Sequence, residues 1–242
     1  MTPTEVTLMT ISGIQKMTLL DFPGKVACTV FLHGCNYRCP FCHNAELLEG
    51  RGEPLMTEEE FLSFLKKRMG LLDGVCISGG EPTLMPGLKE LMAQIKAMGY
   101  AVKLDTNGSR PQVLKELVEA GLVDYVAMDI KNSPSRYGAT CGLSKMDLEA
   151  VEESARYLIS GAVDSEFRTT VAEPLHDESS IAEMGRWLHN LAGDKPVKKL
   201  FLQPFVDRDT VVFSGLKAPE SSQMGEFIKL LQPFVLDVSV RG

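Results

Sequence analysis

The chain has 242 residues, 44% of them hydrophobic and 24% charged, so it is long enough to bury the core of one large α/β domain or two small ones. Its net charge of −7 argues against binding to nucleic acid, which needs a basic surface, and no basic run suggests binding to a membrane. Because six cysteines occur without a signal peptide or a membrane-spanning stretch, we expect reduced thiols and a cytoplasmic protein.

The first part of the chain carries short β-like runs and a turn at Asp21-Phe22-Pro23-Gly24. We expect residues 1–25 to form an N-terminal hairpin or lid. The apolar run at 26–32 predicts the first buried strand of the core. A polar loop follows, and residues 49–54 predict a flexible connection.

Helical and strand patterns then alternate to the end of the chain. Thr57 and Glu60 have the spacing of a capping box, which predicts a helix that ends at Gly70. Further strands are expected at 75–78, 101–104, 125–128, 165–171, 199–203 and 235–240, and further helices at 88–98, 111–121, 147–160, 181–191 and 224–231.

This alternation predicts right-handed βαβ units and a parallel sheet. No linker interrupts it, so we expect residues 26–242 to form one domain. About six units predict an α/β fold of the partial (β/α)6 barrel type, similar to a TIM barrel, with a doubly wound sheet as the structural alternative.

Three cysteines, Cys35, Cys39 and Cys42, fall on the loop that leaves the first core strand, with the spacing C-x3-C-x2-C. Four thiolates ligate a 4Fe–4S cluster fully, so three leave one iron free to bind a small molecule. A zinc site completed by His43 is the alternative, because structural zinc takes four ligands and catalytic zinc takes three. The spacing alone leaves both kinds of metal site open.

The other three cysteines are expected to have no role in a metal site. Cys28 and Cys76 lie within apolar strands, where a thiol behaves as a small core residue. Cys141 lies in a predicted loop, and we interpret it as an incidental thiol.

Polar residues gather at the predicted carboxyl ends of the strands, where β/α barrels place their active sites. The second core strand ends in Ser78-Gly79-Gly80-Glu81-Pro82, in which the glycines allow close approach to the backbone and the carboxylate can accept from an ammonium group. Taken one at a time, such residues are better explained by a turn or a helix cap, but several polar strand ends together indicate a site.

Charged residues follow the next three strands. Lys131 and Arg168 suit a carboxylate, and Asp105 and Asp129 suit ribose hydroxyls or a cation. The alternative for the two cations is a salt bridge across the barrel mouth. The alternative for the two aspartates is a helix N-cap or a partner for Lys103 or Lys131. Together these features offer a free iron on a cluster, a carboxylate that can bind an amine, and cations that can bind a carboxylate. S-adenosylmethionine (SAM) carries the groups that match them.

These motifs resemble those of radical SAM enzymes. The three cysteines match the CxxxCxxC motif, with the aromatic Phe41 before the last one, and 79–82 match the GGEP motif. Within the family, 42–44, 104–108 and 128–131 resemble activating proteins of glycyl radical enzymes. The segments 167–171 and 238–241 resemble the longer anaerobic ribonucleoside-triphosphate reductase activating proteins.

The resemblance implies a 4Fe–4S cluster on the three cysteines, with SAM chelated to its unique iron. Reductive cleavage of SAM would give methionine and a 5′-deoxyadenosyl radical, which takes a hydrogen atom from a glycine of a partner glycyl radical enzyme. Anaerobic ribonucleoside-triphosphate reductase is the expected partner, and flavodoxin or ferredoxin the expected electron donor. A pyruvate formate-lyase type enzyme, a peptide or a small molecule is the alternative substrate, and a zinc-binding protein without enzymatic activity ranks below these.

The resemblance also assigns roles to residues. Gly79, Gly80 and Glu81 would hold the methionine amine, and Asp105 and Lys131 would contact the ribose or the carboxylate. Asp105 and Asp129, with Thr106 and Met128, resemble a monovalent-cation site, and Asn36 or Tyr37 would shield the cluster. The residues expected to contact the cofactors are Phe41, Gly79, Gly80, Glu81, Asp105, Asn107, Lys131, Arg168 and Gln203.

Two positions depart from the activating-enzyme pattern. Asp21-Phe22-Pro23-Gly24-Lys25 stands where those enzymes have DGPG followed by Arg, so a partner-facing role for this loop is not implied. Gln203 stands where they place a His near the adenosine. The remaining cysteines are scattered, so auxiliary clusters are not expected.

Overall fold

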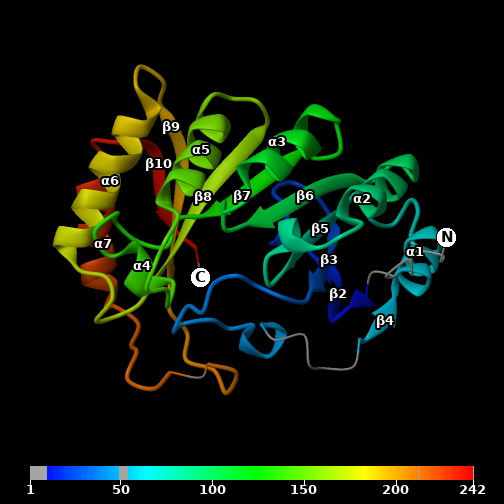
Figure 1. Ribbon diagram of the computed structural model, residues 1–242, viewed down its shortest axis with the longest axis horizontal. Helices are drawn as coiled ribbons and strands as arrows, with labels where there is room; N and C mark the ends of the chain where they lie inside the picture. The colour runs from blue at the N-terminus through cyan, green and yellow to red at the C-terminus, as the bar shows by residue number, and fades with distance from the viewer. Residues whose placement is uncertain (1–9, 49–53, 212, 242) are drawn as a thin grey trace.

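The computed structural model describes residues 10–48, 54–211 and 213–241. Its main feature is an eight-stranded sheet with the spatial order β10-β9-β8-β7-β6-β5-β3-β2 (Figure 1). All neighbouring pairs are parallel except β2 and β3, which are antiparallel. The strands of this sheet are β2 (Gly13–Thr18), β3 (Ala27–Leu32), β5 (Gly74–Gly79), β6 (Ala101–Thr106), β7 (Tyr125–Asp129), β8 (Asp164–Val171), β9 (Val197–Pro204) and β10 (Val235–Val240).

Helices follow the strands and cover the outer face of the sheet (Figure 1). They are α1 (Glu58–Lys66), α2 (Leu88–Ala97), α3 (Pro111–Glu119), α4 (Tyr137–Thr140), α5 (Leu148–Ile159), α6 (Glu178–Ala192) and α7 (Ser221–Leu231), with the 3-10 helices η1 (Ala45–Leu47) and η2 (Pro82–Leu84). None of the helices within the described residues has both the length and the apolar character needed to cross a bilayer.

The expected α/β fold with a mostly parallel sheet is confirmed. The core lies between the sheet and its helices, where side chains such as Val30, Leu104 and Leu200 are fully buried. The capping box at Thr57 is confirmed, because its hydroxyl accepts from Glu60 N and the Glu60 carboxylate accepts from Thr57 N. Helix α1 ends at Lys66, and turns rather than a helix lead to Gly70, which has a φ of 79°.

The N-terminal segment extends the sheet. Residues 1–9 of the expected hairpin or lid lie outside the described residues, as do 49–53 of the expected flexible connection. Strand β1 (Thr10–Ile11) is separated from β2 by Ser12 alone, which is too short for a turn between paired strands. The two strands therefore pair with different partners: β1 pairs antiparallel with β4 (Met56–Thr57), and β2 pairs with β3.

Phe22 closes the amino-terminal end of the strands. Its side chain is only 2% exposed and lies against Tyr125, with ring centroids 6.1 Å apart. Ala27, Cys76 and Ala101 complete this small cluster, which joins the starts of β3, β6 and β7 to the middle of β5. The loop that departs from the DGPG pattern thus has its aromatic residue inside the protein.

Arg241 connects the last strand with the interior of the sheet. Its guanidinium donates through Nη1 to Oε1 of the buried Glu166 on β8, at 2.7 Å, and its Cζ lies 3.6 Å from the centroid of the Phe201 ring. The hydroxyl of Tyr125 on β7 also donates to Glu166, at 2.9 Å. These contacts join β7, β8 and β9 to the segment after β10.

Candidate active site

A cavity of about 410 Å³ lies at the carboxyl ends of the strands, within the range of about 300–1,000 Å³ that is usual for small-molecule sites. Loops after β3, β5, β6 and β7 reach it, together with residues of β8 and β9. Of the residues expected to ligate the cluster or to contact the cofactors, all but Glu81 line it, and Asp129 lines it as well: Cys35, Cys39, Phe41, Cys42, Gly79, Gly80, Asp105, Asn107, Asp129, Lys131, Arg168 and Gln203. Asn36 and Met128 do not line it.

The cysteine loop is held against the end of β5 by backbone contacts that only glycine permits. Gly80 N donates to Leu32 O at 2.9 Å, and Glu81 N donates to Gly34 O at 2.7 Å. A Cβ on Gly79 would overlap Leu32 O, and one on Gly80 would overlap Gly34 O. Gly79 also has a φ of 122°, which side chains disfavour. The two glycines therefore bring the backbone of the cysteine loop into contact with β5.

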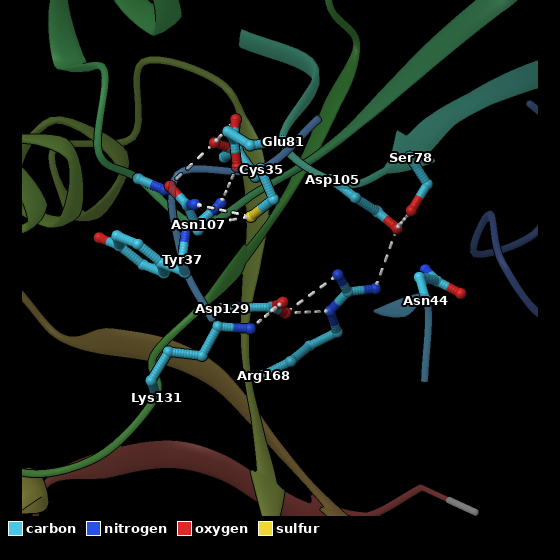
Figure 2. Close-up of polar contacts among 12 residues, drawn as sticks. Cys35, Tyr37, Asn44, Ser78, Glu81, Asp105, Asn107, Asp129, Lys131 and Arg168 are labelled. Carbon is cyan, nitrogen blue, oxygen red and sulfur yellow. Dashed lines mark hydrogen bonds and ion pairs between the residues drawn. The ribbon is translucent and has the colours of Figure 1, made fainter. Parts of the chain in front are cut away.

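Glu81 is the expected cofactor contact that does not line the cavity. It is fully buried, and its carboxylate accepts from Thr106 Oγ1 at 2.8 Å and from Asn107 N at 2.6 Å (Figure 2). Burial raises the pKa of Glu81, although these hydrogen bonds favour its charged form. Glu81 thus joins the end of β5 to the end of β6, and its contact with an amine stays a prediction.

Arg168 lies between two carboxylates (Figure 2). Its Nε donates to Asp129 Oδ1 at 3.0 Å and its Nη1 donates to Asp105 Oδ2 at 3.3 Å. Lys131 Nζ donates to Asp129 Oδ2 at 2.8 Å, and the buried Lys103 pairs with Asp105. Arg168 thus contacts both aspartates that the sequence assigned to a monovalent cation. Binding of that cation stays a prediction.

The network keeps its members charged. Burial disfavours the ionised form of Asp129, but Lys131 and Arg168 outweigh this effect and lower its pKa to about 2. Burial likewise opposes the charge on Lys131, and Asp129 nevertheless raises the pKa of that ammonium group. The cavity therefore presents fixed cations to a ligand at neutral pH.

The three cysteines of the loop differ in acidity. Burial raises the pKa of the Cys35 thiol to about 11 and also raises that of Cys42. A hydrogen bond from the thiol of Cys141 outweighs burial at Cys39 and lowers its pKa to about 7. Cys39 is therefore the thiol of this loop that ionises most readily.

Cys141 is a buried neighbour of the cysteine loop that the sequence did not reveal. It was expected to be an incidental loop thiol, but its side chain is fully buried beside Cys39. By contrast, Cys28 and Cys76 are buried within β3 and β5, as expected. No spacing rule joins Cys141 to the cysteine loop, because a long stretch of chain separates them.

Two further residues fix the cysteine loop in ways the sequence did not specify. Asn107 Nδ2 donates to Asn36 Oδ1 at 2.9 Å, and Asn44 Nδ2 donates to Gly79 O at 3.2 Å. The ring of Tyr37 is 3% exposed and lines the cavity, so this residue contributes to its wall. Asn44 belongs to the run Cys42-His43-Asn44, which is the sequence feature that could have identified it as a site residue.

His43 points away from the cysteines. Its Nε2 lies 2.7 Å from Val206 O, and its ring stacks on Phe205 with a centroid distance of 5.8 Å. Across the described part of the chain, no three His, Cys, Asp or Glu side chains gather closely enough to hold one metal ion. These contacts give no support to His43 as a fourth zinc ligand.

Comparison with known proteins identifies the class to which this fold and site belong. The model of the radical SAM superfamily matches residues 29–188. A protein of Methanocaldococcus jannaschii, provisionally named a glycyl-radical enzyme activating enzyme, is 30% identical over 240 residues, which cover 96% of this chain and 95% of that one. The chain therefore belongs to the radical SAM superfamily, and it is an enzyme of the class that uses a 4Fe–4S cluster and SAM.

Two relatives named pyruvate formate-lyase-activating enzyme extend this similarity. The one from Streptococcus mutans is 26% identical over 209 residues, covering 81% of this chain and 76% of its own. The one from Clostridium pasteurianum is 34% identical over 127 residues, covering 50% of this chain and 52% of its own.

Solved structures confirm the partial-barrel fold. Streptococcus suis SuiB bound to S-adenosylmethionine matches with a TM-score of 0.67 and 11% identity, over 86% of this chain and 48% of that chain. QueE from Escherichia coli matches with a TM-score of 0.57 and 17% identity, over 97% and 94%. At these identities the likeness concerns the fold.

The residues of the cavity fit both cofactors. Thiolates are the ligands of iron–sulfur clusters, and the three thiols of the cysteine loop line one cavity. Lys131 and Arg168 supply charges that a carboxylate needs, and the volume suits a small molecule beside the cysteines.

Proposed function

We propose that this chain activates a glycyl radical enzyme by radical SAM chemistry, and that the partner is an anaerobic ribonucleoside-triphosphate reductase. The observation that carries the proposal is the 30% identity to a relative named for this activation, over nearly the whole length of both chains. The two relatives named for activation of pyruvate formate-lyase support the same class of partner. The choice of the reductase rests on the resemblance of 167–171 and 238–241 to its activating proteins.

In this proposal Cys35, Cys39 and Cys42 hold the 4Fe–4S cluster and leave one iron for the amine and carboxylate of SAM. When bound, the reduced cluster supplies the electron that cleaves SAM to methionine and a 5′-deoxyadenosyl radical. The partner's glycine then provides the hydrogen atom. The chain itself binds, orients and shields these groups.

The chain orients SAM through fixed charges and backbone groups. We assign the methionine carboxylate to Lys131 and Arg168, and the amine to the backbone at Gly79 and Gly80. Asp105 is assigned to the ribose. Because the ion pairs already hold these side chains in place, little ordering is needed when SAM binds.

Buried apolar side chains beside the cysteines would keep water away from the radical. Phe41 is 4% exposed and packs in a cluster with Phe205 and Leu216. Lys131 Nζ lies 5.9 Å from the centroid of the Phe41 ring, so the aromatic face also supports the ammonium group. Exclusion of water limits side reactions of a reactive intermediate.

Four further assignments complete the proposal. A flavodoxin or ferredoxin would donate the electron, and the protein would act in the cytoplasm. Residues 26–242 would form one structural domain, with residues 1–25 as an N-terminal hairpin or lid. Gln203 lines the cavity and would contact the adenosine in place of a histidine.

A small-molecule substrate is the second candidate. The observation in its favour is a 7-carboxy-7-deazaguanine synthase of Koribacter versatilis, which is 30% identical over 150 residues and covers 61% of this chain. The charged residues that line the cavity suit a small polar ligand.

The test uses the whole chain, purified and reconstituted with iron and sulfide without oxygen, then reduced with dithionite and given SAM. We expect 5′-deoxyadenosine, and a glycyl radical detected by electron paramagnetic resonance (EPR) on anaerobic ribonucleoside-triphosphate reductase. Cys35→Ala should give neither product. A radical on pyruvate formate-lyase alone would overturn the choice of partner, and 5′-deoxyadenosine without a radical on either enzyme would favour the small-molecule candidate.

A further inference from the structure

The loop 172–177, which connects β8 with α6, is joined to the segment that follows β7. His176 on this loop is 1% exposed, and its Nε2 lies 2.8 Å from Lys131 O. Asn132 Nδ2 donates in the opposite direction, to Leu175 O, at 2.9 Å. Two hydrogen bonds therefore join the two segments just after β7 ends.

The contacts of the His176 ring determine which of its nitrogens carries the proton. A carbonyl oxygen can only accept, so Nε2 carries the proton and donates to Lys131 O. Nδ1 lies 3.2 Å from both Ala172 N and Ala172 O, and in the neutral ring its lone pair accepts from Ala172 N. One ring nitrogen therefore serves the loop of His176 itself, and the other serves the backbone of Lys131.

The same ring contacts the aromatic residue that faces the Lys131 ammonium group. The ring centroids of His176 and Phe41 are 6.4 Å apart, and Lys131 Nζ lies 5.9 Å from the Phe41 centroid. Asp129 Oδ2 accepts from the same ammonium group at 2.8 Å. The Lys131 side chain, which is 14% exposed and lines the cavity, is therefore held at its backbone by His176 and at its Nζ by Asp129 and Phe41.

We propose that His176 is a positioning residue for SAM binding, which fixes the backbone of Lys131 and so directs its ammonium group toward the methionine carboxylate. A lysine carries its charge on a flexible four-carbon stem. Its ammonium group is placed accurately only when both ends of the stem are held, and Asp129 with Phe41 hold the far end. The inference rests on the proposed contact between Lys131 and SAM, but not on the identity of the partner enzyme.

The test measures SAM affinity by calorimetry on protein reconstituted with iron and sulfide. His176→Asn keeps a polar group near the position of Nδ1 but has no donor that reaches Lys131 O. It should bind SAM roughly 3- to 10-fold more weakly, as expected for the loss of one neutral hydrogen bond. His176→Gln carries its amide N–H near the position of Nε2 and should recover most of the affinity. His189→Gln, at an exposed histidine of α6, is the matched control and should bind SAM like the wild type.

A double-mutant cycle tests whether His176 acts through Lys131. Lys131→Ala alone should weaken SAM binding, and the addition of His176→Asn should weaken it no further, because the ammonium group that His176 positions is then absent. A histidine that shaped the cavity independently of Lys131 would cause the same loss in both backgrounds. Scanning calorimetry sets a temperature at which every variant is folded. If His176→Asn does not fold, His176→Met, which is apolar and lacks a donor, takes its place in the cycle.

Iron and sulfide content, measured on each protein, separates the possible failures. A wild-type chain that binds no cluster, or a cluster but no SAM, would overturn the proposed function and this inference with it. Wild-type affinity in His176→Asn would overturn this inference alone, as would equal losses in the Asn and Gln variants or an equal loss with and without Lys131. Unchanged SAM affinity in Lys131→Ala would overturn the assignment of Lys131 together with this inference and leave the proposed ligation of the cluster in place.

Discussion

Arg168 and Asp129 lie directly opposite each other on the neighbouring parallel strands β8 and β7, and the guanidinium Nε is 3.0 Å from the carboxylate Oδ1. The register of the two strands fixes this pair before any ligand binds. Arg168 reaches Asp105 of β6 as well, so one side chain links β6, β7 and β8. The charged wall of the cavity is therefore part of the sheet.

Replacement of Arg168 should weaken SAM binding. Hydrogen bonds to charged groups contribute about 1.5–3 kcal/mol, so Arg168→Ala should reduce the affinity roughly 10- to 150-fold in calorimetry of the reconstituted protein. Arg168→Lys should recover only part of this loss, because an ammonium group cannot span both carboxylates. Arg156→Ala, which removes an exposed ion pair with Glu152 on α5, is the control, and equal affinities would contradict the assignment of Arg168.

Asp129 should make stability depend on pH in the acid range. Its pKa is lowered to about 2 in the folded protein, against about 3.9 in an unfolded chain. The contribution of Asp129 to the free energy of unfolding is therefore complete above the pKa of the unfolded chain. This contribution is lost as the pH falls from about 4 through 2. Urea denaturation should show wild type more stable than Asp129→Asn at pH 6, with the gap closing below pH 4. A gap that stays constant would show that the carboxylate is not paired.

Gly80→Ala should displace the cysteine loop. The added Cβ overlaps Gly34 O, and such overpacking costs about 1–3 kcal/mol, or roughly 2–4 °C in Tm for each kcal/mol. Gly225→Ala is the matched control, because its Cβ meets no atom within 4 Å and it lies in α7. Scanning calorimetry should show a lower Tm only for the first variant, together with a lower iron content after reconstitution.

Iron and sulfide analysis should separate the cluster from the zinc alternative. We expect Cys35→Ala, Cys39→Ala and Cys42→Ala to lose the cluster, and His43→Ala to keep it, because His43 contacts Val206 and Phe205. Cys76→Ala, a buried cysteine of β5, is the control for loss of a thiol. Bound zinc without sulfide, lost in His43→Ala, would establish the alternative.

Phe22 should contribute to the stability of the fold and not to the affinity for SAM. Phe22→Ala opens a space among the strand starts, and changes of this kind cost about 3–5 kcal/mol. Leu20→Ala, at a side chain that is 80% exposed, should change the free energy of unfolding by less than about 0.5 kcal/mol. Urea denaturation measures both, and a large loss of SAM affinity in Phe22→Ala at a temperature where it is folded would contradict a purely structural role.

Much of the fold was predictable because its signals are local. Apolar runs separated by amphipathic helices marked the parallel strands, and the Thr57 and Glu60 pair marked the start of α1. The site residues could also be proposed, since parallel strands bring their carboxyl ends to one edge. The pairing of β1 with β4 was less accessible, because it joins two short segments that are far apart in the sequence.

The features that escaped prediction depend on contacts between distant segments. Glu81 turns inward because Thr106 and Asn107 of the next strand end offer donors. Cys141 meets Cys39 because Gly142 lets α4 approach the loop. Neither arrangement has a periodicity or spacing that one segment could display by itself.

The direct backbone contact between the cysteine loop and the end of β5 has a mechanical consequence. Two backbone hydrogen bonds, from Gly80 N to Leu32 O and from Glu81 N to Gly34 O, join the two segments, and a Cβ on Gly79 or Gly80 would overlap the facing backbone. We therefore expect the part assigned to the metal and the part assigned to the amine of SAM to move together. Such coupling would keep the distance between the two parts nearly constant.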